Sequence, residues 1–244
     1  MRMKIRSTGW MAGILAVCLL SLSCGLLTTT VMGDTQTDTQ AVKLGSAQAV
    51  KVKIEMGAGE LAIAGNAGDL MEGNFRFNVA DWQPQVRYTE SGSQGALNVS
   101  HREKAVSIPV GKTLVNQWDL RFNNAVPLDL EVNTGAGDNM LDLSGLDLTS
   151  LSLETGAGTT EVDLRGDYGH DLRVTINGGV GNLTVRLPDG MGVHVSTNIG
   201  VGGLTNSGLL RDGDAYVNAL YGNAAHTLFL EIETGVGAVQ LLAP

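Results

Sequence analysis

The chain contains six copies of a Gly-(Ala or Val)-Gly tripeptide, and their spacing constrains the fold more than any other feature. The second to fifth copies begin at Gly135, Gly156, Gly179 and Gly200, at intervals of 21, 23 and 21 residues. Such regular spacing indicates a repeat protein with one supersecondary unit per copy. The twelve glycines are Gly57, Gly59, Gly135, Gly137, Gly156, Gly158, Gly179, Gly181, Gly200, Gly202, Gly235 and Gly237.

Apolar and polar residues alternate on both sides of each copy, as in strands that bury one face. Leu151 and Leu153 precede the third copy, and Val162 and Leu164 follow it, on the other parity. A one-residue shift would turn the later side chains of a straight strand to the wrong face. We therefore predict a bend at the second glycine of each copy, where glycine allows a positive φ. The middle residue is expected to point inward, where the two strand segments converge.

These patterns predict an all-β fold, a solenoid-like stack of short strands with roughly 20 residues per rung. The glycines are interpreted as corners, because a phosphate-binding loop would need a strand followed by a helix, which the sequence does not show. We divide the chain into an export segment (1–33), a polar, flexible tether (34–49), an irregular N-terminal β region or cap (50–125) and a glycine-repeat solenoid (126–244).

The cap is predicted from its aromatic residues. Phe75, Phe77, Trp82 and Trp118 are expected to pack together and cover one end of the stack, since an open end would expose apolar surface and strand edges. Residues 85–90 and 96–103 flank a glycine-containing turn and predict a hairpin. For Trp82, an exposed role in stacking on a carbohydrate is the alternative to packing.

The first 33 residues resemble an export signal. Arg2, Lys4 and Arg6 precede an uncharged apolar stretch over 10–32. This stretch fits either a cleaved signal peptide or an uncleaved membrane helix, and in both cases the rest of the chain is exported. Residues 20–25 also resemble a lipoprotein cleavage site, in which Cys24 would be lipidated. The alternative is that Cys24, like Cys18, is only an apolar residue of the segment.

Charge and cysteine content exclude several classes of partner and site. After residue 33 there are 13 basic and 25 acidic residues, which gives a net charge of 13 − 25 = −12. A surface of this sign repels nucleic acid and anionic phospholipid, so neither is expected as a partner. The same region has no cysteine, and therefore neither a disulfide nor a thiolate metal site.

No catalytic constellation is visible in the sequence. The four histidines, His101, His170, His194 and His226, lie on separate segments and are predicted to be ordinary surface residues. No Gly-x-Ser-x-Gly motif occurs. We predict no enzyme activity, no cofactor and no metal.

Strand carboxylates leave two alternatives open. The solvent-facing ones are Glu131, Asp142, Glu154, Asp163, Glu231 and Glu233. Stacked rungs could align some of them for Ca²⁺, although the repeat period of about 21 differs from the nine residues of calcium-binding β-rolls. A pair of carboxylates on neighbouring rungs would also suit glycan cleavage.

Residues 128–137, 141–146 and 153–158, together with 54–61 and 118–122, resemble the bacterial toast-rack family. The resemblance extends to the β domain of LiaF-type cell-wall-antibiotic-response proteins and to adhesin-like domains built from similar repeats. It covers nearly everything from residue 50 onward. It implies a single-stranded, right-handed β-solenoid-like rack that is exported and membrane-tethered, and it carries no catalytic residues to transfer.

The predicted function is that of a non-enzymatic bacterial envelope protein. The N-terminal segment would hold it at the membrane, and its exposed strand faces would act as an adhesin-like surface for an envelope protein or cell-surface component. Two alternatives remain open: an envelope-stress regulator of a membrane sensor, and a glycan-acting enzyme.

Overall fold

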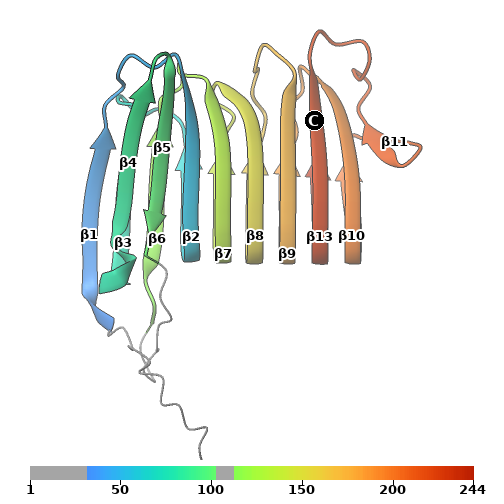
Figure 1. Ribbon diagram of the computed structural model, residues 1–244. Coiled ribbons are helices and arrows are strands. Elements are labelled where there is room, and N and C mark those ends of the chain that lie inside the picture. The colour runs from blue at the N-terminus through green and yellow to red at the C-terminus, as the bar shows by residue number, and fades with distance from the viewer. Residues whose placement is uncertain (1–31, 103–112) are drawn as a thin grey trace, which may run out of the picture.

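The computed structural model describes residues 32–102 and 113–244, which form one mixed sheet of 13 strands (Figure 1). The strands run in the order β1-β3-β6-β2-β7-β8-β9-β13-β10-β12-β11, and β5 pairs with β2 and β4. Their bounds are β1 Met32–Val42, β2 Ala49–Ala64, β3 Met71–Val79, β4 Pro84–Ser91, β5 Gln94–His101, β6 Asn116–Phe122, β7 Leu128–Asp142, β8 Leu148–Asp163, β9 Leu172–Arg186, β10 Gly192–Ser207, β11 Leu210–Asp212, β12 Ala215–Val217 and β13 Thr227–Leu242. One 3-10 turn, Ala80–Trp82, precedes β4.

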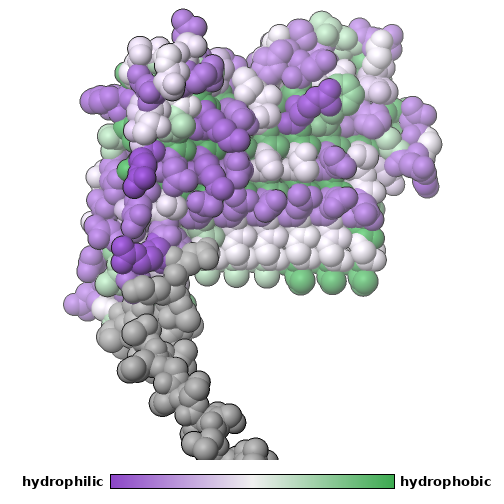
Figure 2. Space-filling view, in the orientation of Figure 1, coloured by the Kyte–Doolittle hydropathy of each residue, from purple (hydrophilic) through white to green (hydrophobic). Residues whose placement is uncertain are grey.

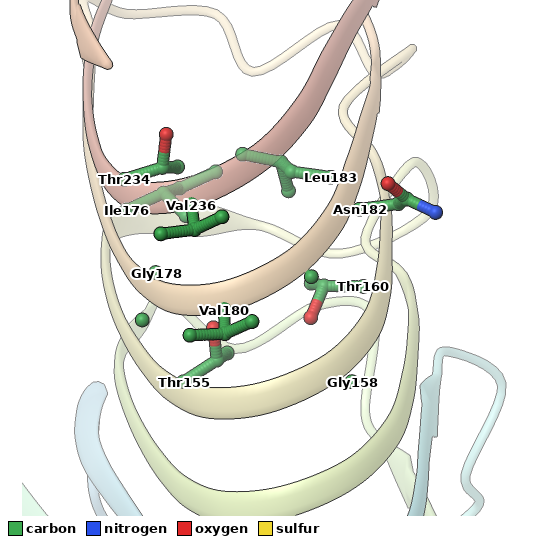
Figure 3. Close-up of a pocket in the computed structure, with 12 residues that line it drawn as sticks. Thr155, Gly158, Thr160, Ile176, Gly178, Val180, Asn182, Leu183, Thr234 and Val236 are labelled. Carbon is green, nitrogen blue, oxygen red and sulfur yellow. The ribbon is translucent and has the colours of Figure 1, made fainter. Parts of the chain in front are cut away.

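Six long strands form a rack of nested U shapes, as Figure 3 shows in end view. They are β2, β7, β8, β9, β13 and β10, and each runs down one arm, through its glycine bend and up the other arm. Neighbouring strands are parallel and in register through both arms, so that every position of the repeat forms a row along the rack. The predicted all-β stack of bent strands is confirmed.

The bend falls at the second glycine of every copy, as predicted. Gly59, Gly137, Gly158, Gly181, Gly202 and Gly237 all have φ between 132° and 150°. The first glycines are required for a different reason. A Cβ on Gly135, for example, would overlap the carbonyl oxygen of Gly57 on the neighbouring strand. Both glycine columns therefore allow the backbones to stack closely.

The prediction that the middle residue of each copy points inward is wrong. Val180, Val201 and Val236 are 57%, 66% and 45% exposed, and Figure 3 shows Val180 and Val236 on the outer side of their bends. The parity shift occurs because the chain turns a corner there. At the corner the residue between the two glycines lies on the convex side. The inward-facing side chains resume at the second residue after the tripeptide, such as Leu61, Asn139 and Leu183, which are at most 5% exposed.

The hydrophobic core fills the space between the two arms. Val132, Leu153 and Ile176 on the first arms face Leu141, Val162 and Val185 on the second, all at most 1% exposed. The connections between rungs close the open top of the U with further buried residues. These are Leu143 and Leu146 after β7, Leu164 and Tyr168 after β8, and Leu187 and Met191 after β9.

The last two rungs do not follow chain order. After β9, the short connection over residues 187–191 leads into β10 and leaves one rung position between β9 and β10 unfilled. The longer connection over residues 208–226, which includes β11 and β12, then leads back to that position, where β13 lies. The final strand, β13, is consequently parallel to both β9 and β10 and lies between them. A solenoid wound strictly in sequence would have placed β13 at the end.

The opposite end is closed by the predicted aromatic cap. Beyond β2, the next rung is split into two strands: β5 extends the first arms and β6 extends the second. The predicted hairpin is confirmed as β4 and β5. Phe75, Phe77, Trp82 and Trp118 are all at most 6% exposed. The first glycine strand, β2, belongs to the rack itself, although the proposed division at residue 125 assigned it to the cap.

The prediction of a flexible tether over 34–49 is wrong for residues 34–42. They belong to β1, which pairs antiparallel with β3 from Gln36 to Val42. Threonine has a high strand propensity, and Thr35, Thr37 and Thr39 alternate with polar residues in a strand that is largely solvated on both faces. An apolar count alone cannot detect such a strand.

The predicted export segment and Cys24 lie almost entirely outside the described residues. Among the described residues, 32–102 and 113–244, no helix is long and apolar enough to cross a membrane.

Candidate functional site

The first arms of the rack carry a row in which Glu and Asn alternate. The register places Glu55 of β2 beside Asn133 of β7, and continues through Glu154 and Asn177 to Glu233 and Asn198. Adjacent strands of a sheet are about 4.8 Å apart. The carboxylates of this Glu–Asn row therefore recur at roughly twice that spacing, about 9.6 Å.

An amide between each pair of carboxylates has an electrostatic advantage. Like charges directly opposite each other on neighbouring strands are destabilising, whereas an amide can donate hydrogen bonds to either side. Glu154 and Glu233 remain exposed. The Glu–Asn row is therefore a regular, solvent-facing array of acceptors and donors that runs the full length of the rack.

A neighbouring row on the same face contains paired charges. Lys53 Nζ lies 3.2 Å from Glu131 and 3.1 Å from Glu55, and Lys51 lies 3.6 Å from Glu131. Partial burial disfavours the charge of Glu131, but the hydrogen bond and charge of Lys53 outweigh this effect and hold the pKa of the Glu131 carboxyl below its ordinary value. The β2 end of this face is thus cross-linked by ion pairs, while the β8 to β10 end has few charges to pair.

Two other predicted surface carboxylates also have local partners. Asp163 lies 2.6 Å from Arg165, and although burial opposes its ionisation, the hydrogen bonds of Arg165 lower the pKa of the carboxyl. Asp142 accepts a hydrogen bond of 2.6 Å from the Ser144 hydroxyl. No group of three or more His, Cys, Asp or Glu within 32–102 and 113–244 is arranged to hold a metal ion.

The second arms carry a shallow groove of about 730 Å³ between β3, β6, β2, β7 and β8. Its lining includes four acidic residues, Glu60, Asp119, Asp138 and Glu161, and the 61% exposed Met140. Arg76 donates to Gln117 at 2.8 Å, and Gln117 donates to Glu60 at 2.8 Å, so that the Glu60 carboxylate is held in a hydrogen-bonded chain.

This groove lacks an aromatic platform for a sugar ring. Trp118 lies beneath it but is only 1% exposed. Trp82 is 6% exposed, and its ring packs against that of His101 at a centroid distance of 5.8 Å. The alternative prediction of an exposed, carbohydrate-stacking Trp82 is therefore wrong, because the tryptophan completes the cap.

The convex lower edge of the rack is an apolar ridge, visible in Figure 2 as a row that becomes more hydrophobic toward β10. The register aligns its members, one per rung, in the order Ala58, Ala136, Ala157, Val180, Val236 and Val201. Glycines flank each of them, and Val180, Val236 and Val201 are 57%, 45% and 66% exposed.

One cavity of the rack is too small for an organic ligand. The cavity in Figure 3 has a volume of about 20 Å³, which is enough for one water molecule. The buried Thr160 hydroxyl, whose residue lines this cavity, accepts a hydrogen bond of 3.2 Å from Asn139 of the neighbouring strand β7.

His101 has a role that the sequence did not reveal. We predicted a surface residue, but it is 8% exposed and its Nε2 accepts a hydrogen bond of 3.0 Å from the Gly57 N–H. Beside it, Asn116 Nδ2 donates to the Ala58 carbonyl at 2.6 Å. The split rung of β5 and β6 has no glycine bend of its own. The side chains of His101 and Asn116 therefore make the hydrogen bonds to the β2 bend that the backbone of a complete rung would make. Only the topology, in which His101 ends β5 and Asn116 begins β6, brings them together.

This architecture defines a class of protein: a glycine-cornered β-rack with extended, regular outer faces. Residues 31–186 match the family described as the N-terminal domain of toast_rack, DUF2154. The chain therefore belongs to the toast-rack family, as the sequence motifs indicated.

Similarity to one solved structure agrees with this assignment. A "putative cell adhesion protein" from Clostridium sporogenes ATCC 15579 is 30% identical and aligns over 86% of this chain and 100% of its own, with a TM-score of 0.83. A "putative adhesin" from Bacteroides fragilis NCTC 9343 is 10% identical over 86% of this chain and 99% of its own, with a TM-score of 0.27. No curated protein matches the chain.

Proposed function

We propose that this protein is a non-catalytic, adhesin-like component of the bacterial envelope, held at the membrane by its N-terminal segment. The observation that carries the proposal is the Glu–Asn row, with exposed carboxylates every second rung along a rigid face. A periodic surface favours an extended partner with repeated groups over a small substrate. The similarity to the protein from C. sporogenes, whose description mentions cell adhesion, supports the same reading.

The partner we propose is a cell-surface polymer or envelope protein with repeated hydrogen-bond donors or positive charges. Glu154 of β8 and Glu233 of β13, which are both exposed, would contact it directly. Such a contact relies on many weak interactions in register, which gives avidity without a deep pocket.

The test is attachment of cells that produce the full chain to surfaces coated with isolated bacterial envelope. Replacing Glu154 and Glu233 by lysine should reduce attachment at least tenfold. A matched control replaces Asp142 and Glu161, on the other arms, by lysine and changes the net charge equally. Equal loss in both variants would indicate a nonspecific charge effect and contradict the proposed face. Unchanged attachment after deletion of the gene would contradict the adhesive function itself.

A further inference from the structure

The interior of the rack is partly polar next to the bends. The register aligns Thr155 of β8, Gly178 of β9 and Thr234 of β13, each immediately before a glycine tripeptide. On the opposite arms, the row two residues after the tripeptides contains Asn139 of β7 beside Thr160 of β8, which are 5% and 4% exposed. Buried polar groups of this kind normally have hydrogen-bond partners, so this part of the interior calls for a complete account of its hydrogen bonds.

Gly178 is a glycine that neither the bend nor the close stacking of strands requires. Its φ lies outside the left-handed region. A Cβ at this position would lie 3.2 Å from the Thr234 methyl group and 3.7 Å from Thr155 Oγ1, both of them side-chain atoms. The other five long strands carry a side chain at the equivalent position: Met56, Thr134, Thr155, Thr234 and Ile199. The side chain that β9 lacks therefore leaves space between two threonines.

Gly178 lines the cavity of about 20 Å³ that Figure 3 shows, together with Thr155, Thr160 and Thr234. A cavity needs about 10–15 Å³ to hold one water molecule, and the water needs two to four polar partners. The volume of this cavity meets the first requirement, and the three threonine hydroxyls around it meet the second.

The hydroxyl groups around the cavity have hydrogen-bonding capacity to spare. Thr160 Oγ1 accepts the hydrogen bond of 3.2 Å from Asn139, so its own proton can be donated to another group. Thr234 Oγ1 is buried and has no hydrogen-bond partner within residues 32–102 and 113–244. An unsatisfied buried hydroxyl destabilises the folded state, whereas a bridging water satisfies it nearly as well as a direct hydrogen bond does.

We propose that this cavity binds one ordered water molecule, which takes the place of the side chain that β9 lacks. The water accepts a hydrogen bond from Thr160 and donates to Thr155 and Thr234. All three groups are uncharged, which favours a neutral ligand over a buried cation, whose charge would be uncompensated. The water links β8 to β13 across β9, so the site is complete only once β13 has paired with β9.

A crystal structure of the full-length protein tests the site directly. We expect density for a water molecule about 2.5–3.0 Å from the Oγ1 atoms of Thr160 and Thr234. Gly178→Ala should displace this water, because the added methyl group would enter the cavity, and the density should be absent from a structure of that variant. A dry cavity in the unaltered protein would overturn the proposal, and so would a water that keeps its position in the variant.

Thermal unfolding of a second variant separates a hydrated hydroxyl from a dry one by the sign of the change. Thr234→Val replaces Oγ1 by a methyl group of similar size. Removal of a dry, unpartnered hydroxyl should raise the midpoint of unfolding, whereas loss of a bond to the water should lower it by about 2–4 °C. Thr205→Val, at an exposed position of β10, is the matched control for the change in strand propensity and should leave the midpoint unaltered. A midpoint for Thr234→Val that equals or exceeds that of the control would contradict the water site.

Discussion

At the scale of single residues, the second glycine of each repeat is the position least open to change. Gly158 has φ +132°, which strains any residue with a Cβ, and an added Cβ would also overlap the carbonyl oxygen of Gly137. Because the clash is with backbone of the adjacent rung, a different rotamer cannot relieve it. Strain and overlap therefore act together at this position.

We expect Gly158→Val to reduce the free energy of unfolding by about 3 kcal/mol or more. For a chain of this size that corresponds to a fall of roughly 6–12 °C in the midpoint of thermal unfolding, measured by circular dichroism. Gly190→Val is the matched control, since Gly190 has ordinary φ and open space around its Cβ site. Equal midpoints for the two variants would contradict the role of the bend.

At the scale of elements, the split rung shows how side chains can replace a missing bend. His101→Ala would leave the Gly57 N–H without its acceptor and remove a ring that packs against Trp82 and Trp118. An unsatisfied buried donor costs about 1–3 kcal/mol. We expect a loss of stability in this range, measured by urea unfolding.

Faster hydrogen exchange at the Gly57 amide would localise that effect to the cap. His226→Ala, in the connection before β13, serves as the control and should change neither the stability nor this exchange rate. An unchanged Gly57 amide in the His101 variant would show that another group closes this end of the rack.

The elements also show how far the sequence could predict the fold. Period-2 alternation and the parity shift located the bends of all six long strands, and the aromatic residues located the cap. The same patterns could not show which side of the bend Ala157 or Val180 occupies, because parity does not distinguish a bulge from a corner. Nor could they reveal β1, whose threonines pair without burying an apolar face, or His101, whose partner Gly57 is 44 residues away.

At the scale of the whole molecule, only the type of the candidate site could be predicted from the sequence. The sequence indicated exposed strand faces without a pocket, but the Glu–Asn row depends on the insertion of β13 between β9 and β10. In chain order the last three members would be Asn177, Asn198 and Glu233, and the alternation would be lost. Long-range strand order of this type leaves no local signal in the sequence.

Under the proposed function, the mode of membrane attachment is a further prediction at this scale. If Cys24 is lipidated, Cys24→Ser should release the protein from the membrane fraction, whereas an uncleaved helix would retain it. Fractionation of cells followed by immunoblotting measures this, and Cys18→Ser is the matched control. Release of both variants, or of the unaltered chain, would contradict lipid anchoring through Cys24.

The position of β13 has a consequence for assembly. Until the residues of β13 have been synthesised, β10 has no long strand to lie against, and β9 ends the stack of parallel rungs. The position between β9 and β10 therefore remains unfilled until β13 pairs with both strands. Removal of β13 would also leave β10 without its neighbouring long strand. The loss of this one strand would therefore disrupt two rungs of the rack.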